Sequence, residues 1–198
     1  MSDSVSEYGR AGIVGLGTPQ ANPTAEAEMR ILLPPDAALA VARLTSRSLC
    51  PDQRLRDYLE RLEETLSQYD SLQPEAFGFA CTGSSYLAEP GKEERIAEAM
   101  EKRFGYPIFT ATAAIAWQLA RMGARRIALV SPYPPALAEA AVAYWRRAGF
   151  AVVATERIET GSADTRSIYE LASDDAAPAA AALRKRDVDI VLFSGTGL

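Results

Sequence analysis

The sequence predicts an α/β fold in which mostly parallel sheets, covered by helices on both faces, form two similar halves. Short β-rich segments alternate with amphipathic helical segments along the chain, which is typical of βαβ units. Near Gly105 the alternation starts again with a second series of strands and helices. With 198 residues, 48% of them hydrophobic, the chain is long enough to bury the core of such a fold.

Seven segments have the composition of buried strands, because short apolar runs rich in β-branched residues lie between turn residues. They are residues 11–17, 38–45, 76–82, 107–110, 126–131, 151–158 and 189–194. The clearest helix covers residues 52–72, since its leucines recur at steps of three and four residues, opposite a charged face. These leucines are Leu55, Leu59, Leu62 and Leu66.

Further helices are predicted over residues 92–104, 113–123, 134–149 and 178–187. Several of them end at a glycine, as helices often do. We therefore expect one α/β half over residues 1–105 and a second over residues 106–198. If the two sheets face each other, the carboxyl ends of their strands surround one cleft, where open α/β sheets bind ligands.

Composition and charge limit the classes of partner. The net charge is −5 and the basic residues are scattered, which argues against binding to nucleic acid or to an anionic membrane surface. No apolar run approaches the roughly 20 residues of a membrane-spanning helix, and the first residues do not resemble a secretory signal. We therefore expect a cytoplasmic protein that acts on small molecules.

The chain contains no histidine, which excludes a Ser-His-Asp triad, a Cys-His pair and a histidine-ligated metal. Its two cysteines, Cys50 and Cys81, lie in unlike contexts without the spacing of metal ligands, so no metal site is predicted. The opening "GIVGLG" lacks the last glycine of a dinucleotide fingerprint, since Gln20 stands there, and "SGTG" near the end is not a phosphate loop. No cofactor is expected.

The most informative strand end is "CTGSS", which follows the third predicted strand. Thr82, Gly83, Ser84 and Ser85 can present hydroxyl and backbone N–H groups together, and such a cluster suits a carboxylate or a developing oxyanion. Cys81 lies beside it, so its thiol is a candidate nucleophile or proton donor whose thiolate these dipoles favour. The alternative is a buried structural cysteine.

Other strand ends supply further candidates. Asn22 could donate its amide to a carboxylate or could serve as a turn or helix cap. Tyr133, held between prolines, could point into the cleft or pack beneath it. Glu26 and Glu28 are typical of the first turn of a helix, and Cys50 is interpreted as structural or incidental.

Four segments together resemble those of one enzyme superfamily. They are "TPQANPTAEAE", "FACTGSSYL", the stretch from "GYPIFT" to "YWRRAGF" and "DIVLFSGTGL". The set resembles the aspartate/glutamate racemase superfamily, and within it the branch of maleate cis-trans isomerases and arylmalonate decarboxylases. The most specific parts are the cysteine of "ACT", the tyrosine of "SPY" and the pattern formed by Pro19, Asn22, Glu26 and Glu28.

The resemblance implies two facing α/β halves with pseudo-twofold symmetry, a site between them, and cofactor-free chemistry on a small dicarboxylate or related acid. Cys81 matches the nucleophile of the first half. Asn22 and Tyr133 match residues that hold a carboxylate and stabilise an oxyanion, while Thr82 and Gly83 match the anion pocket after the cysteine. A homo-oligomer is also implied.

The second half departs from the family pattern. Where a second thiol is expected, the chain has Gly195, followed by Thr196, so we expect these residues to contact substrate instead and do not expect two-thiol racemisation. Because Leu198 directly follows the last strand, the sequence is interpreted as part of a longer chain. We expect an isomerase of the maleate type, with an arylmalonate-type decarboxylase, another enzyme of the superfamily or a non-catalytic carboxylate-binding protein as alternatives.

Overall fold

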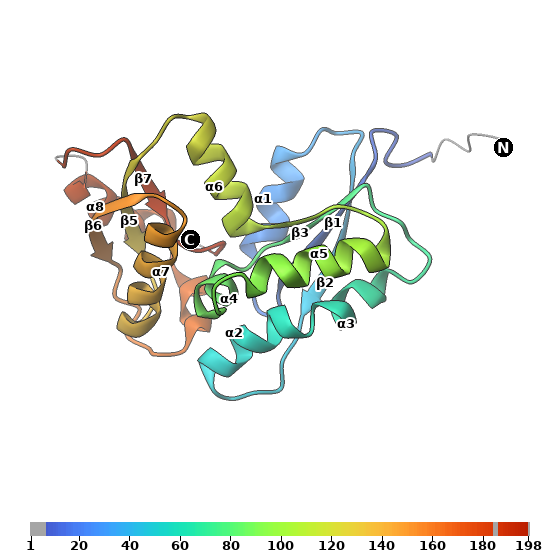
Figure 1. The fold of residues 1–198 in the computed structure, drawn as a ribbon, viewed down its shortest axis with the longest axis horizontal. Helices are drawn as coiled ribbons and strands as arrows, with labels where there is room; N and C mark the ends of the chain where they lie inside the picture. Colours follow the sequence, from blue (N-terminus) through green and yellow to red (C-terminus); the bar gives the residue numbers. More distant parts are fainter. Residues whose placement is uncertain (1–6, 184–185, 198) are drawn as a thin grey trace.

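The computed structural model describes residues 7–183 and 186–197 and contains two separate parallel sheets (Figure 1). The first sheet has the strand order β2-β1-β3-β4, and the second has the order β6-β5-β7. The first is built from β1 (Ile13–Pro19), β2 (Ala38–Leu44), β3 (Ala76–Phe79) and β4 (Ile108–Thr110). The second is built from β5 (Arg126–Ser131), β6 (Ala151–Arg157) and β7 (Ile190–Phe193). The predicted parallel α/β fold is therefore confirmed.

The strand β4 belongs to the first sheet. We expected this strand at the start of the second series, but it pairs in parallel with β3, with Phe77 opposite Ile108. Buried Ile108 thus completes the apolar surface beside Phe77, a contact that sequence order does not reveal. The chain therefore passes from the first sheet to the second between β4 and β5. The predicted domain boundary at residue 105 concerns independent folding units and stays a prediction.

Helices cover both faces of the first sheet because apolar side chains alternate along its strands. Leu16 packs on one face against α1 (Thr24–Leu32), and Phe77 and Phe79 pack on the other. The second face is covered by α2 (Pro51–Glu60), α3 (Leu62–Leu66) and α5 (Lys92–Phe104). The helix predicted over 52–72 is divided, since Arg61 leaves helical geometry at φ −104° and ψ 25° and a 3₁₀ turn, η1 (Ser67–Tyr69), follows α3.

The second sheet repeats this arrangement. Ile127 and Leu129 of β5 face α7 (Pro135–Arg147), whereas Ala128 and Val130 face α8 (Ser173–Leu183). A 3₁₀ helix, η2 (Thr165–Glu170), lies between β6 and α8. The helix predicted over 178–187 begins earlier than expected, and residues 184–185 lie outside the described part of the chain.

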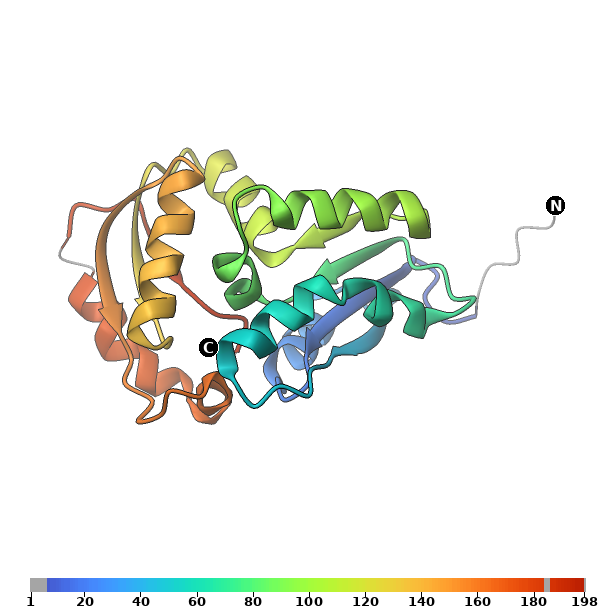
Figure 2. The ribbon, with the colours of Figure 1, turned by 60° about the horizontal axis from the view of Figure 1, so that its bottom comes forward.

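The two halves meet at α4 (Thr82–Leu87), which lies between them in Figure 2. Tyr86 of this helix packs edge to face against Tyr133 and Trp145 of the second half, with ring centroids 6.0 and 6.3 Å apart. Trp145 Nε1 donates a hydrogen bond to the Tyr86 hydroxyl at 3.1 Å, and that hydroxyl also bonds to Ser194 at 2.9 Å. Another helix, α6 (Ala111–Arg121), links the sheets along the chain. These contacts fix the orientation of the two strand ends that form the site.

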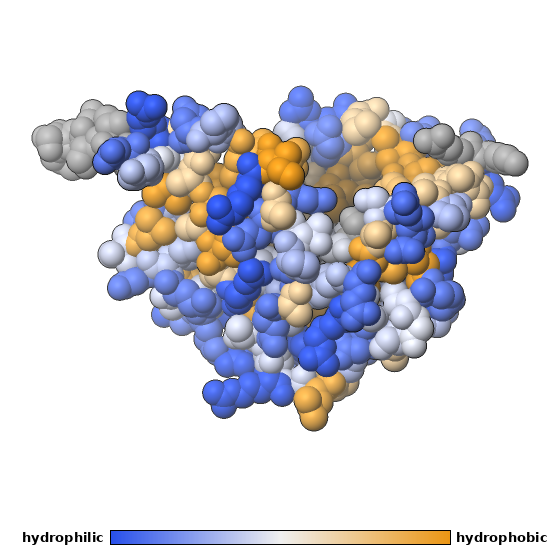
Figure 3. Space-filling view, turned by 180° about the vertical axis from the view of Figure 1, so that it is seen from behind, coloured by the Kyte–Doolittle hydropathy of each residue, from blue (hydrophilic) through white to orange (hydrophobic). Residues whose placement is uncertain are grey.

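The surface mixes apolar and charged side chains. Viewed from behind, hydrophobic patches alternate with hydrophilic residues over both halves (Figure 3). Over the described ranges, none of the helices combines the length and the apolar composition needed to cross a membrane.

Candidate functional site

Cys81 lies where β3 ends and α4 begins, at the carboxyl edge of the first sheet. Its backbone is extended, with φ −147° and ψ 94°, and the following residues turn into the helix. Ser84 Oγ donates to Cys81 Sγ at 3.1 Å, and the backbone N–H groups of Gly83 and Ser84 also bond to the sulfur. The residues predicted to form a cluster of donors for a substrate anion are therefore the first turn of α4. Donors of Gly83 and Ser84 in this turn bond to the Cys81 sulfur.

The environment of Cys81 favours the protonated thiol. Burial raises the pKa of the Cys81 thiol, because a thiolate is poorly solvated inside the protein. Hydrogen bonds from Ser84 and Gly83 lower the pKa, as the sequence analysis expected, but burial outweighs them. The side chain is 4% exposed, so the sulfur becomes a thiolate at neutral pH only if the site is hydrated or reorganised.

Cys81 lines a small cavity between the two halves. Its volume of about 20 Å³ is enough for one water molecule but not for a dicarboxylate. It is lined by Pro19, Leu55, Cys81, Tyr133, Thr165, Ile168, Tyr169, Gly195, Thr196 and Gly197. Cys81 is thus a buried cysteine at a cavity wall, a position that lies between the two alternatives considered from the sequence.

Tyr133 forms the wall contributed by the end of β5. Its hydroxyl lies 2.9 Å from Thr82 Oγ1, so a hydrogen bond joins the halves beside the cavity. Burial raises the pKa of Tyr133 well above its usual value, and the phenol therefore remains a hydrogen-bond donor at neutral pH.

Gly195 completes this wall. A Cβ added at Gly195 would lie 3.5 Å from the Tyr133 hydroxyl, so a side chain there would face the tyrosine. Its φ of 150° also favours glycine over other residues.

Asn22 has the capping role considered from the sequence, and its amide contacts Thr196, while donation to a substrate carboxylate stays a prediction. Its Oδ1 accepts hydrogen bonds from the backbone N–H groups of Thr24 and Ala25, which caps α1. Its Nδ2 donates to the Thr196 carbonyl oxygen at 3.2 Å and to Thr196 Oγ1 at 3.3 Å. Thr196 Oγ1 in turn donates to the Ala80 carbonyl oxygen at 2.9 Å. This chain of bonds holds the loop after β7 against the first half.

The structure brings all the sequence-predicted residues together but in two layers. Cys81, Tyr133, Gly195 and Thr196 line the cavity directly. The others lie behind that wall with their polar groups engaged; they are Asn22, Thr82, Gly83 and Ser84. Their predicted role as substrate contacts stays a prediction.

One segment of the second half that lines the cavity was not predicted from the sequence. Thr165, Ile168 and Tyr169 of η2 line it, although η2 does not start at a strand end. Tyr169 lies so close to Gly197 that a Cβ there would be 2.5 Å from the ring, which explains the glycine. The position of the segment, in the connection that follows β6, was the available signal.

An ion pair fastens this segment to the first half. Arg54 Nη2 of α2 donates to Asp164 Oδ1 at 2.5 Å, and Arg54 is only 2% exposed. Asp164 also bonds to Arg166, which is exposed. The hydrogen bond from Arg166, with the charge of Arg54, lowers the pKa of Asp164 to about 2, so the carboxylate is charged at neutral pH.

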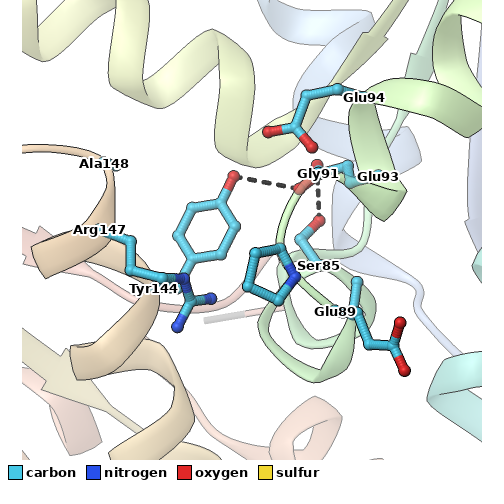
Figure 4. A pocket seen from close by; sticks show the side chains of 10 residues that line it. Ser85, Glu89, Gly91, Glu93, Glu94, Tyr144, Arg147 and Ala148 are labelled. Carbon is cyan, nitrogen blue, oxygen red and sulfur yellow. Dashed lines mark hydrogen bonds between the residues drawn. The ribbon is translucent and has the colours of Figure 1, made fainter.

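A larger hollow of about 240 Å³ lies where α4, α5 and α7 meet (Figure 4). Its buried Glu93 accepts hydrogen bonds from Ser85, Thr112 and Tyr144, at 2.8, 2.5 and 3.0 Å. Neither cysteine lines this hollow. Because Glu93 joins α4 to helices of both sheets, we interpret it as a residue that positions the helix starting at Cys81.

The fold and the site define a class of α/β enzymes with a cysteine between two facing halves. A family model described as arylmalonate decarboxylase matches residues 14–198, and the chain belongs to this family. The family predicted from the sequence is therefore confirmed.

Individual relatives agree with this assignment. The maleate isomerase of Nocardia farcinica is 26% identical over 190 residues, which cover 91% of this chain and 74% of the relative. A structure of the Nocardia farcinica maleate cis-trans isomerase, a cysteine-to-serine mutant with a covalently bound succinylcysteine intermediate, has a TM-score of 0.80 at 25% identity. It covers 93% of this chain and 78% of that one.

A structure of arylmalonate decarboxylase has a TM-score of 0.64 at 21% identity and covers 94% of this chain and 77% of that one. This likeness confirms the predicted fold. Together, the comparisons support the predicted enzyme of the maleate isomerase type, with the decarboxylase as the related alternative, and they are consistent with a cysteine nucleophile.

Proposed function

We propose that the protein is a cofactor-independent cis-trans isomerase of a small dicarboxylate, of the maleate isomerase type, with Cys81 as its nucleophile. One observation carries this proposal: Cys81 lines a cavity between the halves together with Tyr133, whose hydroxyl stays protonated at neutral pH. A similar protein, the isomerase from Nocardia farcinica, has a structure with a succinylcysteine intermediate, which is the adduct that such a sulfur would form with maleate.

The reaction follows from addition and elimination at one sulfur. Water that enters with the substrate takes the proton of the Cys81 thiol, and the thiolate donates an electron pair to one alkene carbon of maleate. A C–S bond forms, the π pair moves onto the neighbouring carbon and its carboxylate, and that carbon is protonated reversibly by water, which gives the succinyl adduct. The former double bond is now single and rotates. The electron pair then re-forms the double bond in the trans geometry as the C–S bond breaks and returns its pair to sulfur. No oxidant or reductant is consumed.

The polar groups around the sulfur suit this charge movement. Tyr133 can donate a hydrogen bond to the carboxylate oxygen on which charge develops, an interaction that is stronger in the intermediate than in the substrate. Thr82 orients the tyrosine hydroxyl across the junction. The donors of Ser84 and Gly83 stabilise the thiolate each time it is released. Gly195 and Thr196 line the cavity beside Tyr133, and Asn22 holds Thr196 in place from behind the wall.

Mass spectrometry after incubation with maleate tests the proposal. We expect a succinyl adduct on Cys81 and formation of fumarate, and the Cys81→Ala variant should lose both. The matched control is Cys50→Ala, which should still form the adduct and fumarate because Cys50 is exposed and does not line the cavity. A wild-type chain that forms neither adduct nor fumarate would contradict the proposed activity.

The second candidate is a decarboxylase of the arylmalonate type, which the family model favours. In that reaction a C–C bond breaks, carbon dioxide leaves, and the resulting carbanion takes a proton from the Cys81 thiol. A protonated Cys81 at neutral pH suits this role. Release of carbon dioxide from an arylmalonate, lost in Cys81→Ala, would favour this candidate. Carboxylate binding without any conversion would instead indicate a binding protein.

A further inference from the structure

We propose that Arg54 is the receptor for one carboxylate of the substrate, and that Asp164 occupies this receptor while the site is closed. The inference deepens the proposed function and rests on it, because it assumes that the cavity at Cys81 receives a dicarboxylate. It assigns a role to a buried charge that the addition and elimination steps leave unused.

Arg54 belongs to the turn of α2 that borders the cavity. Its neighbour in α2, Leu55, lines the cavity, and Leu55 also packs on Gly83, whose N–H bonds to the Cys81 sulfur. Burial raises the pKa of Tyr58 to about 12, and the charges of Cys81 and Arg54 both act on it. Both groups are therefore near enough to Tyr58 to influence its ionisation, although Arg54 does not itself line the cavity.

The partner of Arg54 lies on the segment that has to move. Asp164 immediately precedes Thr165, which lines the cavity as the first residue of η2. Because the cavity of about 20 Å³ cannot hold a dicarboxylate, a wall has to move before substrate reaches Cys81, and we assign this movement to η2, which supplies Thr165, Ile168 and Tyr169 to the lining. This movement takes Asp164 away from Arg54.

The consequences for the two charges are unequal. Asp164 keeps a counter-ion when η2 moves, since Arg166 is part of the same segment and bonds to both carboxylate oxygens. Among the residues that the structure describes, Asp164 is the one carboxylate paired with Arg54, and a buried guanidinium without a counter-ion is strongly unfavourable. A carboxylate of the incoming substrate replaces the aspartate, and a planar guanidinium matches its geometry well.

The binding of succinate to the full chain tests this exchange. Succinate has two carboxylates but no double bond, so Cys81 cannot add to it. We expect Arg54→Gln to weaken succinate binding about 10- to 100-fold, and Asp164→Asn to strengthen it at least threefold because the competing carboxylate is neutralised. The matched control, Arg61→Gln, removes an exposed arginine at the end of α2 that pairs with Glu64 and should leave affinity unchanged.

Two further readouts separate a binding role from a structural one. Succinamate, which has one carboxylate and one amide, should bind wild type more weakly than succinate but bind Arg54→Gln as well as succinate does. If Arg54→Gln does not fold, Asp164→Asn decides the matter. Unchanged or weaker succinate binding by that variant would overturn the inference, because a purely structural ion pair predicts only lost stability.

The proposed function and this inference can fail separately. Conversion of maleate to fumarate with unaltered KM in folded Arg54→Gln would retain the proposed function and reject the carboxylate receptor. Succinate binding that depends on Arg54 and is strengthened by Asp164→Asn, in a chain that forms no fumarate, would support the receptor and reject the isomerase.

Discussion

The strand ends of β3 and β7 occupy equivalent places in the two sheets, yet they carry different chemistry. β3 lies beside β1 as β7 lies beside β5, so Cys81 and Gly195 correspond, as do Asn22 and Tyr133. After β3 the chain turns into a helix whose donors meet at a sulfur. After β7 it crosses to the first half through Thr196.

This difference means that the cavity has one reactive wall. A nucleophile on one side suffices for addition, rotation and elimination, whereas inversion of a stereocentre needs acid and base groups on opposite faces. The second wall is the side of the cavity formed by Tyr133 and Gly195. There the Tyr133 hydroxyl lies where a side chain of residue 195 would point. The comparison therefore favours isomerisation by one thiol and assigns the second wall to hydrogen bonding.

Removal of the Tyr133 hydroxyl should have the largest effect on this division of roles. We expect Tyr133→Phe to lower kcat/KM for maleate by about 100-fold, since loss of one oxyanion donor typically costs roughly 10²–10³-fold. It also leaves buried Thr82 without this partner, which should lower the free energy of unfolding by about 1–3 kcal/mol. Steady-state kinetics and urea unfolding measure the two effects.

Tyr86→Phe provides the matched control. Its hydroxyl also joins the halves, through Ser194 and Trp145, but Tyr86 does not line the cavity. A similar loss of stability with turnover close to wild type is expected. Equal losses of turnover in both variants would show that Tyr133 acts only by holding the halves together.

The two cysteines should differ in reactivity by a smaller but clear margin. Cys50 is exposed and Cys81 is buried, so iodoacetamide should modify Cys81 at least tenfold more slowly at neutral pH. Because burial raises the pKa of Cys81, its thiolate fraction should still be increasing above pH of about 8.5, where an ordinary thiol is half ionised. Mass spectrometry of the two peptides across pH measures both rates.

In urea the two cysteines should react alike, which serves as the control. A Cys81 rate that reaches its plateau at the same pH in the folded chain as in urea would contradict the effect of burial.

The raised pKa of Cys81 also has a consequence for stability. The protonated thiol is favoured in the folded state, so its contribution to stability is present below the unfolded pKa and is lost as pH rises through the folded value.

The sequence predicted much of this site because parallel strands place their carboxyl ends at one edge. That rule alone brought Cys81, Tyr133 and Gly195 to the same region. It could not show that "TGSSYL" is helical, because threonine, glycine and serine have low helix propensity and this helix is stabilised by packing between the halves.

Nor could the sequence reveal the closed state. The position of η2 depends on contacts between residues far apart in the chain, such as Tyr169 against Gly197 and Arg54 with Asp164. The sheet to which β4 belongs is equally a matter of tertiary packing, in which Ile108 lies beside Phe77. Local patterns define the elements, but the pairing of distant surfaces decided these features.

A thiol placed on the second wall should give the smallest effect and the sharpest test of the comparison. Gly195→Cys fits the space, since its Cβ would meet Tyr133 and Pro132 at ordinary contact distances, 3.5 and 3.6 Å. The φ of 150° costs about 1–3 kcal/mol for a residue other than glycine. A well-placed general acid accelerates a reaction roughly 10²–10⁴-fold. A thiol on this strained backbone should supply a small part of that acceleration and raise kcat for maleate isomerisation about fivefold.

Gly195→Ala separates the thiol from the backbone strain, because it adds a Cβ at the same φ without a sulfur. We expect Gly195→Ala to turn over no faster than wild type, so the gain in Gly195→Cys is due to the sulfur. If both variants lose activity equally, the second wall tolerates no side chain at residue 195. Glycine would then be required there by the close approach of the two halves, and the missing thiol would not be the reason for its low activity.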